Sequence, residues 1–172
     1  MVYCQRDPEG MRGHGCVKTK LVPMTELVAF RPAKAQDFAF CQRIYFDGMG
    51  WIIERLQLDM ERQYEGFVDQ WKAGEVRVIV VADEDAGWLQ VTQADDIIFL
   101  GQLFLAKPYQ GRGIGRYVVQ FLIEEAKEAR KAITLGVVKI NPARRFYERL
   151  GFSVTHEDQY KVYMRREPDI CD

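Results

Sequence analysis

Short apolar runs separated by turn residues recur along the chain and predict a protein rich in β-strands. β-Branched and aliphatic runs, or strict alternation of apolar and polar residues, are typical of strands. Such segments occupy residues 27–31, 76–81, 88–91, 97–105, 133–140, 152–156 and 160–166. The last two flank Glu157-Asp158-Gln159 and predict a hairpin. Asp83-Glu84-Asp85 is expected to form another turn, between the second and third segments.

Apolar residues at three- and four-residue spacing predict helices after the first strand. Asp37 lies in the first turn of a helix whose apolar side carries Phe38, Cys41, Ile44 and Tyr45, and we expect this helix to break at Gly48 and Gly50. A second helix is expected to end before Gly74. Its apolar positions are expected to lie in the core, and they are Leu56, Met60, Tyr64, Phe67, Val68 and Trp71.

The segment that follows has the order strand, turn, helix, strand. The apolar run 97–105 leads through Pro108 into a glycine-rich turn, and a helix carries one apolar stripe at Ile114, Val118, Phe121, Leu122, Ala126 and Ala129. Strands joined by a crossover helix pair in parallel. A short helix opened by Pro142 and ended before Gly151 precedes the final hairpin. We therefore expect a mixed sheet with helices.

Length and charge restrict the organisation and the partners. The chain has 172 residues, 48% of them hydrophobic, which predicts one domain over residues 27–172. Lys and Arg number 24 against 25 for Asp and Glu, and no run of 18 apolar residues occurs, so we expect neither a nucleic-acid partner nor a membrane span. Residues 1–26 show no periodicity and no secretory signal. We expect a flexible arm there, with Met24 as an alternative natural start.

The four cysteines predict neither a disulfide framework nor a zinc site. Cys4, Cys16, Cys41 and Cys171 form no Cys-x-x-Cys pair. His14 beside Cys16 is the one metal alternative, and a single pair is a weak signal. Free thiols are typical of a reducing compartment, so we expect a cytoplasmic protein without a metal.

The glycine-rich turn has the chemistry of an anion-binding loop. The first amides of a helix lack partners and attract phosphate, and three glycines at 111, 113 and 115 allow the backbone to approach a diphosphate. Arg112 and Arg116 add positive charge. A dinucleotide fingerprint requires glycine where Arg116 stands, and no Gly-Lys-Ser or Gly-Lys-Thr of a Walker loop occurs. A tight turn that binds nothing remains the alternative.

Two ordered motifs resemble those of the GNAT family of N-acetyltransferases. Gln110, Gly113 and Gly115 match the acetyl-CoA loop of that family, and residues 141–152 resemble its Asn, Ala, Phe-Tyr, Leu-Gly-Phe segment. The resemblance extends over residues 27–166. It implies the GNAT fold, an α/β (α+β) mixed sheet of about seven strands with about four helices and a splay between the central parallel strands.

The resemblance also implies residue roles for acetyl-CoA as cosubstrate. Cofactor binding falls to the backbones of Leu103 and Leu105, to Asn141, and to the loop residues Gln110, Gly111, Arg112, Gly113, Ile114, Gly115 and Arg116. From the residues alone, both leucines are equally consistent with core positions. Tyr147 matches the family's proton donor, and a phenol with a pKa near 10 can protonate a thiolate. Packing of Tyr147 in its helix is the alternative.

The acceptor and the general base are less defined. Glu54, Asp95, Asp96 and His156 are candidate bases by residue type, and ordered water is an alternative. The resemblance implies that residues 46–54 and the final hairpin determine specificity. Between residues 54 and 75 six acidic side chains stand against three basic ones. They would attract a cationic amine, although a solvated helix face explains them more simply.

Two functions follow from these patterns. The first is an acetyl-CoA-dependent N-acetyltransferase that acetylates a primary amine of a small molecule or peptide by direct attack. The second is a non-catalytic acyl-CoA-binding sensor or regulatory module. The intact 110–115 loop together with Tyr147 favours the enzyme. The resemblance is also compatible with a homodimer.

Overall fold

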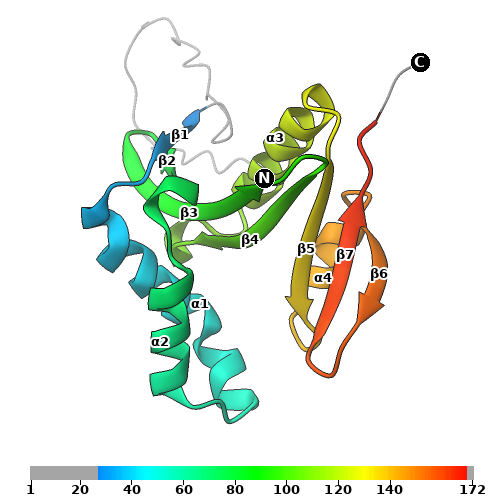
Figure 1. The fold of residues 1–172 in the computed structure, drawn as a ribbon. Coiled ribbons are helices and arrows are strands. Elements are labelled where there is room, and N and C mark those ends of the chain that lie inside the picture. Colours follow the sequence, from blue (N-terminus) through cyan, green and yellow to red (C-terminus); the bar gives the residue numbers. More distant parts are fainter. Residues whose placement is uncertain (1–26, 170–172) are drawn as a thin grey trace, which may run out of the picture.

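The computed structural model describes residues 27–169, and their central element is one seven-stranded sheet (Figure 1). Its strand order is β1-β2-β3-β4-β5-β7-β6. The strands are β1 (Val28–Pro32), β2 (Val76–Val81), β3 (Glu84–Gln93), β4 (Ile97–Leu105), β5 (Ala132–Val138), β6 (Ser153–Glu157) and β7 (Lys161–Arg166). The predicted arm, Cys4, His14, Cys16 and Cys171 lie outside the described residues.

Four α-helices cover the sheet on both faces. They are α1 (Phe38–Arg55), α2 (Met60–Gln70), α3 (Ile114–Glu128) and α4 (Ala143–Glu148). The core against α3 and α4 gathers the larger set of buried residues, and a smaller aromatic cluster with Phe67 and Trp88 lies under α1 and α2. Within the described residues no helix is both long and apolar enough to cross a membrane. The predicted mixed sheet with four helices is therefore confirmed.

The sheet is antiparallel except between β4 and β5. That parallel pairing runs only from Ile97 opposite Ala132 to Leu100 opposite Leu135. β4 continues to Leu105 and β5 to Val138 without further pairing to each other, and Figure 1 shows the two strands diverging. The expected splay therefore begins immediately after Leu100.

A bulge in β4 lies at the same level. Val91 of β3 is opposite Leu100, but Gln90 is opposite Gln102, so Gly101 is the extra residue. A bulge changes which side of the strand each following residue faces. The consequence for the site is described below.

Two predicted boundaries are wrong. α1 runs unbroken through Gly48 and Gly50, although glycine was expected to end it. A Cβ on Gly48 would lie 2.8 Å from the Phe104 ring, so the glycine allows close packing on β4. The β2–β3 turn consists of Ala82 and Asp83, both with positive φ, and β3 already begins at Glu84. Two-residue hairpins favour this left-handed geometry.

The expected core stripe of the second helix is also wrong in part. Of its residues Phe67 is buried, whereas Met60, Tyr64 and Val68 are exposed. α2 begins after Asp59, whose side chain accepts a hydrogen bond from the Arg62 backbone at 2.9 Å. The helix thus contributes a single large ring to the core, because it lies at the edge of the sheet's helical layer.

A charge cluster joins β1, the start of α1 and β3. The Arg31 guanidinium donates to both Asp37 oxygens at 2.8 and 2.9 Å and to Asp85 at 2.7 Å. Asp37 is buried and also accepts the Lys34 backbone N–H at 2.7 Å. The Arg31 hydrogen bonds lower the pKa of Asp37 to about 2, and the carboxylate pair raises the pKa of Arg31.

Candidate active site

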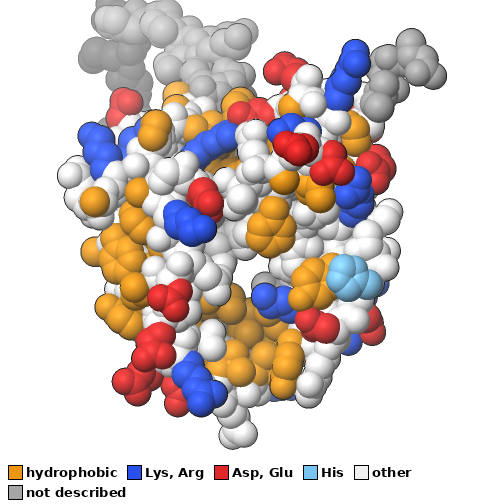
Figure 2. All heavy atoms as spheres, viewed as in Figure 1, with side chains coloured by type: hydrophobic (Ala, Val, Ile, Leu, Met, Phe, Trp, Pro, Cys, Tyr) orange, Lys and Arg blue, Asp and Glu red, His pale blue; other side chains and the backbone are white. Residues whose placement is uncertain are grey.

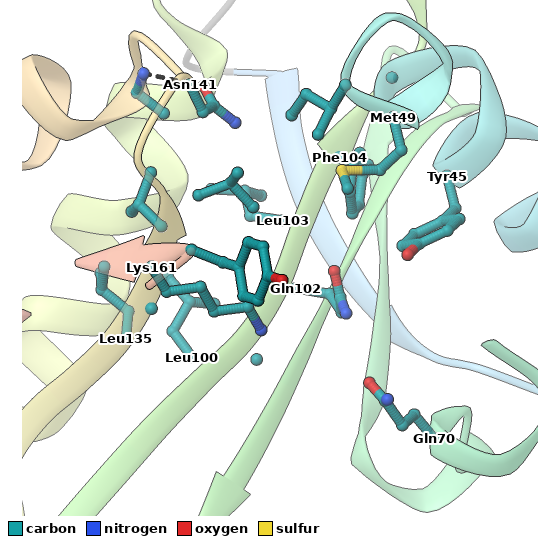
Figure 3. A pocket seen from close by; sticks show the side chains of 18 of the residues that line it. Tyr45, Met49, Gln70, Leu100, Gln102, Leu103, Phe104, Leu135, Asn141 and Lys161 are labelled. Atoms are coloured by element: carbon teal, nitrogen blue, oxygen red, sulfur yellow. Dashed lines mark hydrogen bonds between the residues drawn. The ribbon is translucent and has the colours of Figure 1, made fainter. Parts of the chain in front are cut away.

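A cavity of about 430 Å³ opens where β4 and β5 separate. Its walls come from β4, α1 and α2 on one side and from β5, α4 and the β6–β7 turn on the other. Figure 2 shows the surface hollowed between these two sides. In Figure 3, Tyr45, Met49 and Gln70 approach from the helical wall, while Asn141 and Lys161 approach from the β5 side.

The glycine loop has the geometry expected of an anion-binding turn. Gly111 and Gly113 have φ of 72° and 81°, and a Cβ at either would meet nothing within 4 Å. Gly113 is the N-cap of α3, and the Tyr117 amide is the first to donate back, to Gly113 at 3.0 Å. The amides of residues 114–116 find no acceptor in the described part of the chain. Three donors thus face outward, flanked by the exposed Arg112 and Arg116.

Gln110 holds the loop against the sheet. Its side-chain Nε2 donates to the Leu105 carbonyl at 2.7 Å, and its backbone N–H donates to Lys107 at 3.2 Å. The sequence analysis placed Gln110 among the cofactor-binding residues. The structure shows that its side chain positions the loop relative to the end of β4.

The bulge decides which backbone groups of β4 face the cavity. Before it, Asp96 directs its carbonyl to Ala132 of β5 at 3.0 Å, so Ile98 and Leu100 also face β5. After it, the Ala106 backbone N–H donates to the Ala86 carbonyl of β3 at 2.8 Å. Because backbone groups alternate in direction along a strand, the N–H and C=O groups of Phe104 and Gln102 also point to β3.

The backbone groups of Leu103 and Leu105 therefore point to the open side. β5 has already diverged there, and the Leu105 carbonyl is taken by Gln110. The Leu103 amide and carbonyl and the Leu105 amide remain for a ligand. Both side chains pack against the α3 core, so the residues serve as core and as binding backbone at once.

Asn141 lines the cavity two residues before α4 begins. Its Oδ1 accepts the Ala143 amide at 2.9 Å, which is the dashed line beside Asn141 in Figure 3. This bond orients the side chain and leaves its NH₂ group for a ligand. The cofactor-binding role implied by the resemblance stays a prediction.

Tyr147 lines the same cavity from α4. Its ring packs on Phe146 and Phe152 with centroid distances of 5.1 and 5.6 Å. Burial raises the pKa of Tyr147 to about 12, so the phenol is protonated throughout the physiological range. Packing and proton donation are compatible here, because the ring is held by neighbours while the residue borders the cavity.

The candidate bases lie elsewhere. Asp95 and Asp96 precede the paired end of β4, opposite to the splay, and Glu54 is exposed on α1. His156 stacks on the Tyr163 ring with centroids 4.4 Å apart, and its Nδ1 lies 3.0 Å from the Thr155 hydroxyl. None of the four lines the cavity. Of the six acidic residues between 54 and 75, all but the half-buried Glu75 are exposed.

Several lining residues were not singled out as site residues from sequence. They are Tyr45, Gln63, Gln70 and Gln102. Residues 46–54 and the final hairpin were expected to shape specificity, and both line the cavity, with Gly48, Met49 and Ile52 from the former and Tyr160 and Lys161 from the latter. The glutamines left no signal, because a lone amide on a helix or strand resembles any exposed residue. Within residues 27–169 no group of three metal-ligating side chains occurs.

Comparisons with known proteins agree with this geometry. A family model described as the acetyltransferase (GNAT) family matches residues 39–152. Among solved structures, the PaiA N-acetyltransferase from Thermoplasma acidophilum in complex with coenzyme A has a TM-score of 0.69 at 14% identity, covering 81% of this chain and 98% of its own. No curated protein matches the sequence.

Two further solved structures resemble the chain to a similar degree. An acetyltransferase from Streptococcus agalactiae has a TM-score of 0.63 at 14% identity, covering 83% of this chain and 99% of its own. A putative GNAT acetyltransferase from Desulfovibrio desulfuricans has a TM-score of 0.60 at 22% identity, covering 81% and 98%. At these identities the likeness shows the fold.

Proposed function

The chain belongs to the acetyltransferase (GNAT) family, and on that premise we propose that it is an N-acetyltransferase that uses acetyl-CoA. In this proposal the acetyl group passes to a primary amine of a small molecule or peptide by direct attack. We infer the cytoplasm as its place of action. A non-catalytic acyl-CoA-binding module is the function against which the proposal has to be tested.

The residues around the cavity fit a coenzyme A thioester. The outward amides of residues 114–116, with Arg112 and Arg116, suit a diphosphate. The open backbone groups of Leu103 suit the amide-bearing arm that such a ligand places between diverging strands. The Asn141 NH₂ group adds a donor on the β5 side of the cavity. Gln110 connects the loop to the end of β4, and the preceding residues of β4 line the cavity.

Acetyl-CoA supplies an activated acyl group, and the chain's own residues then have three tasks. A donor is needed where negative charge develops on the acyl oxygen, and the Leu103 amide faces that space. A proton is needed by the departing sulfur, and we assign it to the Tyr147 phenol. The amine has to lose a proton, and no carboxylate or histidine of residues 27–169 lines the cavity, so we assign this step to water.

The observation that carries the proposal is the meeting of three features at one place. The glycine loop is tied to the end of β4 by Gln110, the unpaired half of β4 begins at the bulge, and Tyr147 borders the same cavity. A binding module needs the first two features. An enzyme needs, in addition, a proton donor at the reacting end, and the Tyr147 phenol fits that need.

Calorimetric titration with acetyl-CoA and with CoA tests binding, and thiol release against a panel of amines, on the same sample, tests turnover. We expect micromolar binding of both and amine-dependent release of thiol. Binding without release for any amine would favour the module. Absence of binding would overturn the assignment of the 110–116 loop.

A further inference from the structure

Among residues 27–169, no negatively charged side chain lines the cavity that borders β4. Its polar members are tyrosines, amides and one lysine, Lys161. Many amines that occur in cells are cations, and a site for a simple cationic amine gains from nearby carboxylates. This cavity has the opposite charge, so its acceptor is expected to carry something that compensates a positive wall.

An adjoining cavity of about 220 Å³ has the same character. It shares Tyr45, Gln63, Gln70 and Gln102 with the first. Its one charged lining residue is Arg62, and it also contacts Trp88, whose buried indole N–H has no acceptor in the described part of the chain. Both cavities therefore offer hydrogen-bond donors and positive charge.

Lys161 is placed to reach the cavity from the β5 side. It lies opposite Val138 in the β5–β7 pairing, and its aliphatic stem passes over Gly136, where a Cβ would come within 3.8 Å of the Lys161 Cδ. The stem thus lies within van der Waals reach of the β5 backbone. Figure 3 shows the Lys161 side chain extending from the β5 side toward the middle of the cavity.

The Lys161 ammonium has no hydrogen-bond or ion-pair partner in residues 27–169, which is also true of Lys107 and Lys127. Of these three lysines, Lys161 is the one that lines the cavity. The nearest acid along the chain is Asp158, whose carboxylate accepts the Tyr160 and Lys161 amides and the Tyr163 hydroxyl. Asp158 is thus hydrogen-bonded within the β6–β7 turn rather than to the Lys161 ammonium, and these hydrogen bonds, with a smaller contribution from the Lys161 charge, lower the pKa of this carboxyl.

We propose that the acceptor is a small amine that also carries a carboxylate, and that Lys161 binds this carboxylate. The inference rests on the proposed N-acetyltransferase function and names its substrate class. An ammonium and a carboxylate form a charge-assisted hydrogen bond, and the amide side chains of the wall supply further donors. The same positive charge disfavours a second cation nearby, which helps the amine to lose its proton before attack.

Matched pairs of acceptors test the proposal. Alanine, leucine and phenylalanine are compared with their primary amides in the thiol-release assay at saturating acetyl-CoA. Each amide has nearly the size of its acid, and its amine loses a proton more readily. A preference for the acid therefore cannot arise from amine protonation.

We expect at least one acid to be acetylated with kcat/KM about tenfold or more above that of its amide. Lys161→Met should remove that preference by lowering kcat/KM for the acid and leaving the amide nearly unchanged. Lys161→Arg should keep it, because the charge is retained. Lys127→Met, at an exposed lysine of α3 away from the cavity, is the control and should behave as the wild type.

Two failures can be told apart. Equal turnover of acids and amides, turnover of amides or simple amines alone, or a preference that survives Lys161→Met would overturn the carboxylate proposal while the transferase stands. Absence of thiol release with every amine, in a protein that binds CoA, would overturn the transferase and this inference with it.

Discussion

The two halves of β4 differ in their neighbours rather than in their residues. Residues 97–100 pair with β3 on one side and β5 on the other, whereas residues 102–105 pair with β3 alone. Both halves are mainly apolar. The paired half contributes Ile98 and Leu100 to the buried core, and the unpaired half lines the cavity. A strand can therefore change from structural to functional through the loss of one neighbour.

The comparison predicts that stability depends mostly on the paired half and its helix. Leu122 of α3 is buried, whereas Leu103 is only half-buried. Leu122→Ala should lower the free energy of unfolding by about 3 kcal/mol, because it leaves a cavity in the core, and Leu103→Ala by about 1 kcal/mol. Urea denaturation measures both. Equal losses in the free energy of unfolding would show that the unpaired half of β4 is as important for stability as the paired half and its helix.

A second variant tests whether the open half holds the chemistry. Tyr147→Phe removes only the phenol oxygen, and we expect turnover to fall about a hundredfold while affinity for CoA stays unchanged. Tyr64→Phe, at an exposed ring of α2, is the matched control. Unchanged turnover in Tyr147→Phe would remove the residue from the mechanism and leave it as packing.

The pH dependence of stability compares the two regions by their charges. A buried carboxylate, Asp37, lies where β1, α1 and β3 meet, whereas none of the described carboxylates lines the cavity. The folded-state pKa of Asp37 is about 2, below its ordinary value of 3.8. Its stabilising contribution is therefore complete above pH 4 and is lost as the pH falls through 2, by about 2 kcal/mol in total. Denaturation curves between pH 6 and pH 2 measure it. Asp37→Asn should be less stable at pH 6 and lack this part of the acid dependence; an identical dependence would assign it to other groups.

The smallest expected effect concerns the glycine loop at the edge of the open half. Gly113 has a φ of 81° with open space around it, so Gly113→Val strains the backbone without a clash in the protein. We expect about a tenfold loss of CoA affinity by calorimetry, together with a loss of about 1 kcal/mol in the free energy of unfolding from the strained backbone. Gly74→Val, also in open space but with ordinary φ, is the control. Unaltered affinity would mean that the ligand does not depend on this turn.

The sequence predicts the elements whose causes are local. The glycine loop followed by a helical stripe predicts α3 and its open amides, because glycine adopts the left-handed backbone of such a turn without strain. The β-branched run 76–81 predicts β2 with its boundaries unchanged. Tyr147 and Asn141 line the cavity, while their roles stay predictions.

Features that depend on distant partners could not be predicted. Gly48 does not end α1, since its role is the close approach to Phe104, more than fifty residues further along the chain. The bulge at Gly101 exists only relative to β3, and the position of Lys161 at the cavity depends on the pairing of β7 with β5. Contacts of this kind shape the cavity, and for that reason the sequence does not identify the acceptor.

The bulge at Gly101 also sets where β4 can change in length by mutation. The residues after it already lie opposite consecutive residues of β3, from Gln102 opposite Gln90 to Leu105 opposite Gly87. Deleting Gly101 would therefore make the strand regular and leave these later residues on their present faces. Deleting or inserting one residue between Gln102 and Leu105 would instead exchange the faces of the residues that follow. Gly101 is thus the position at which β4 can lose a residue without turning its side chains over.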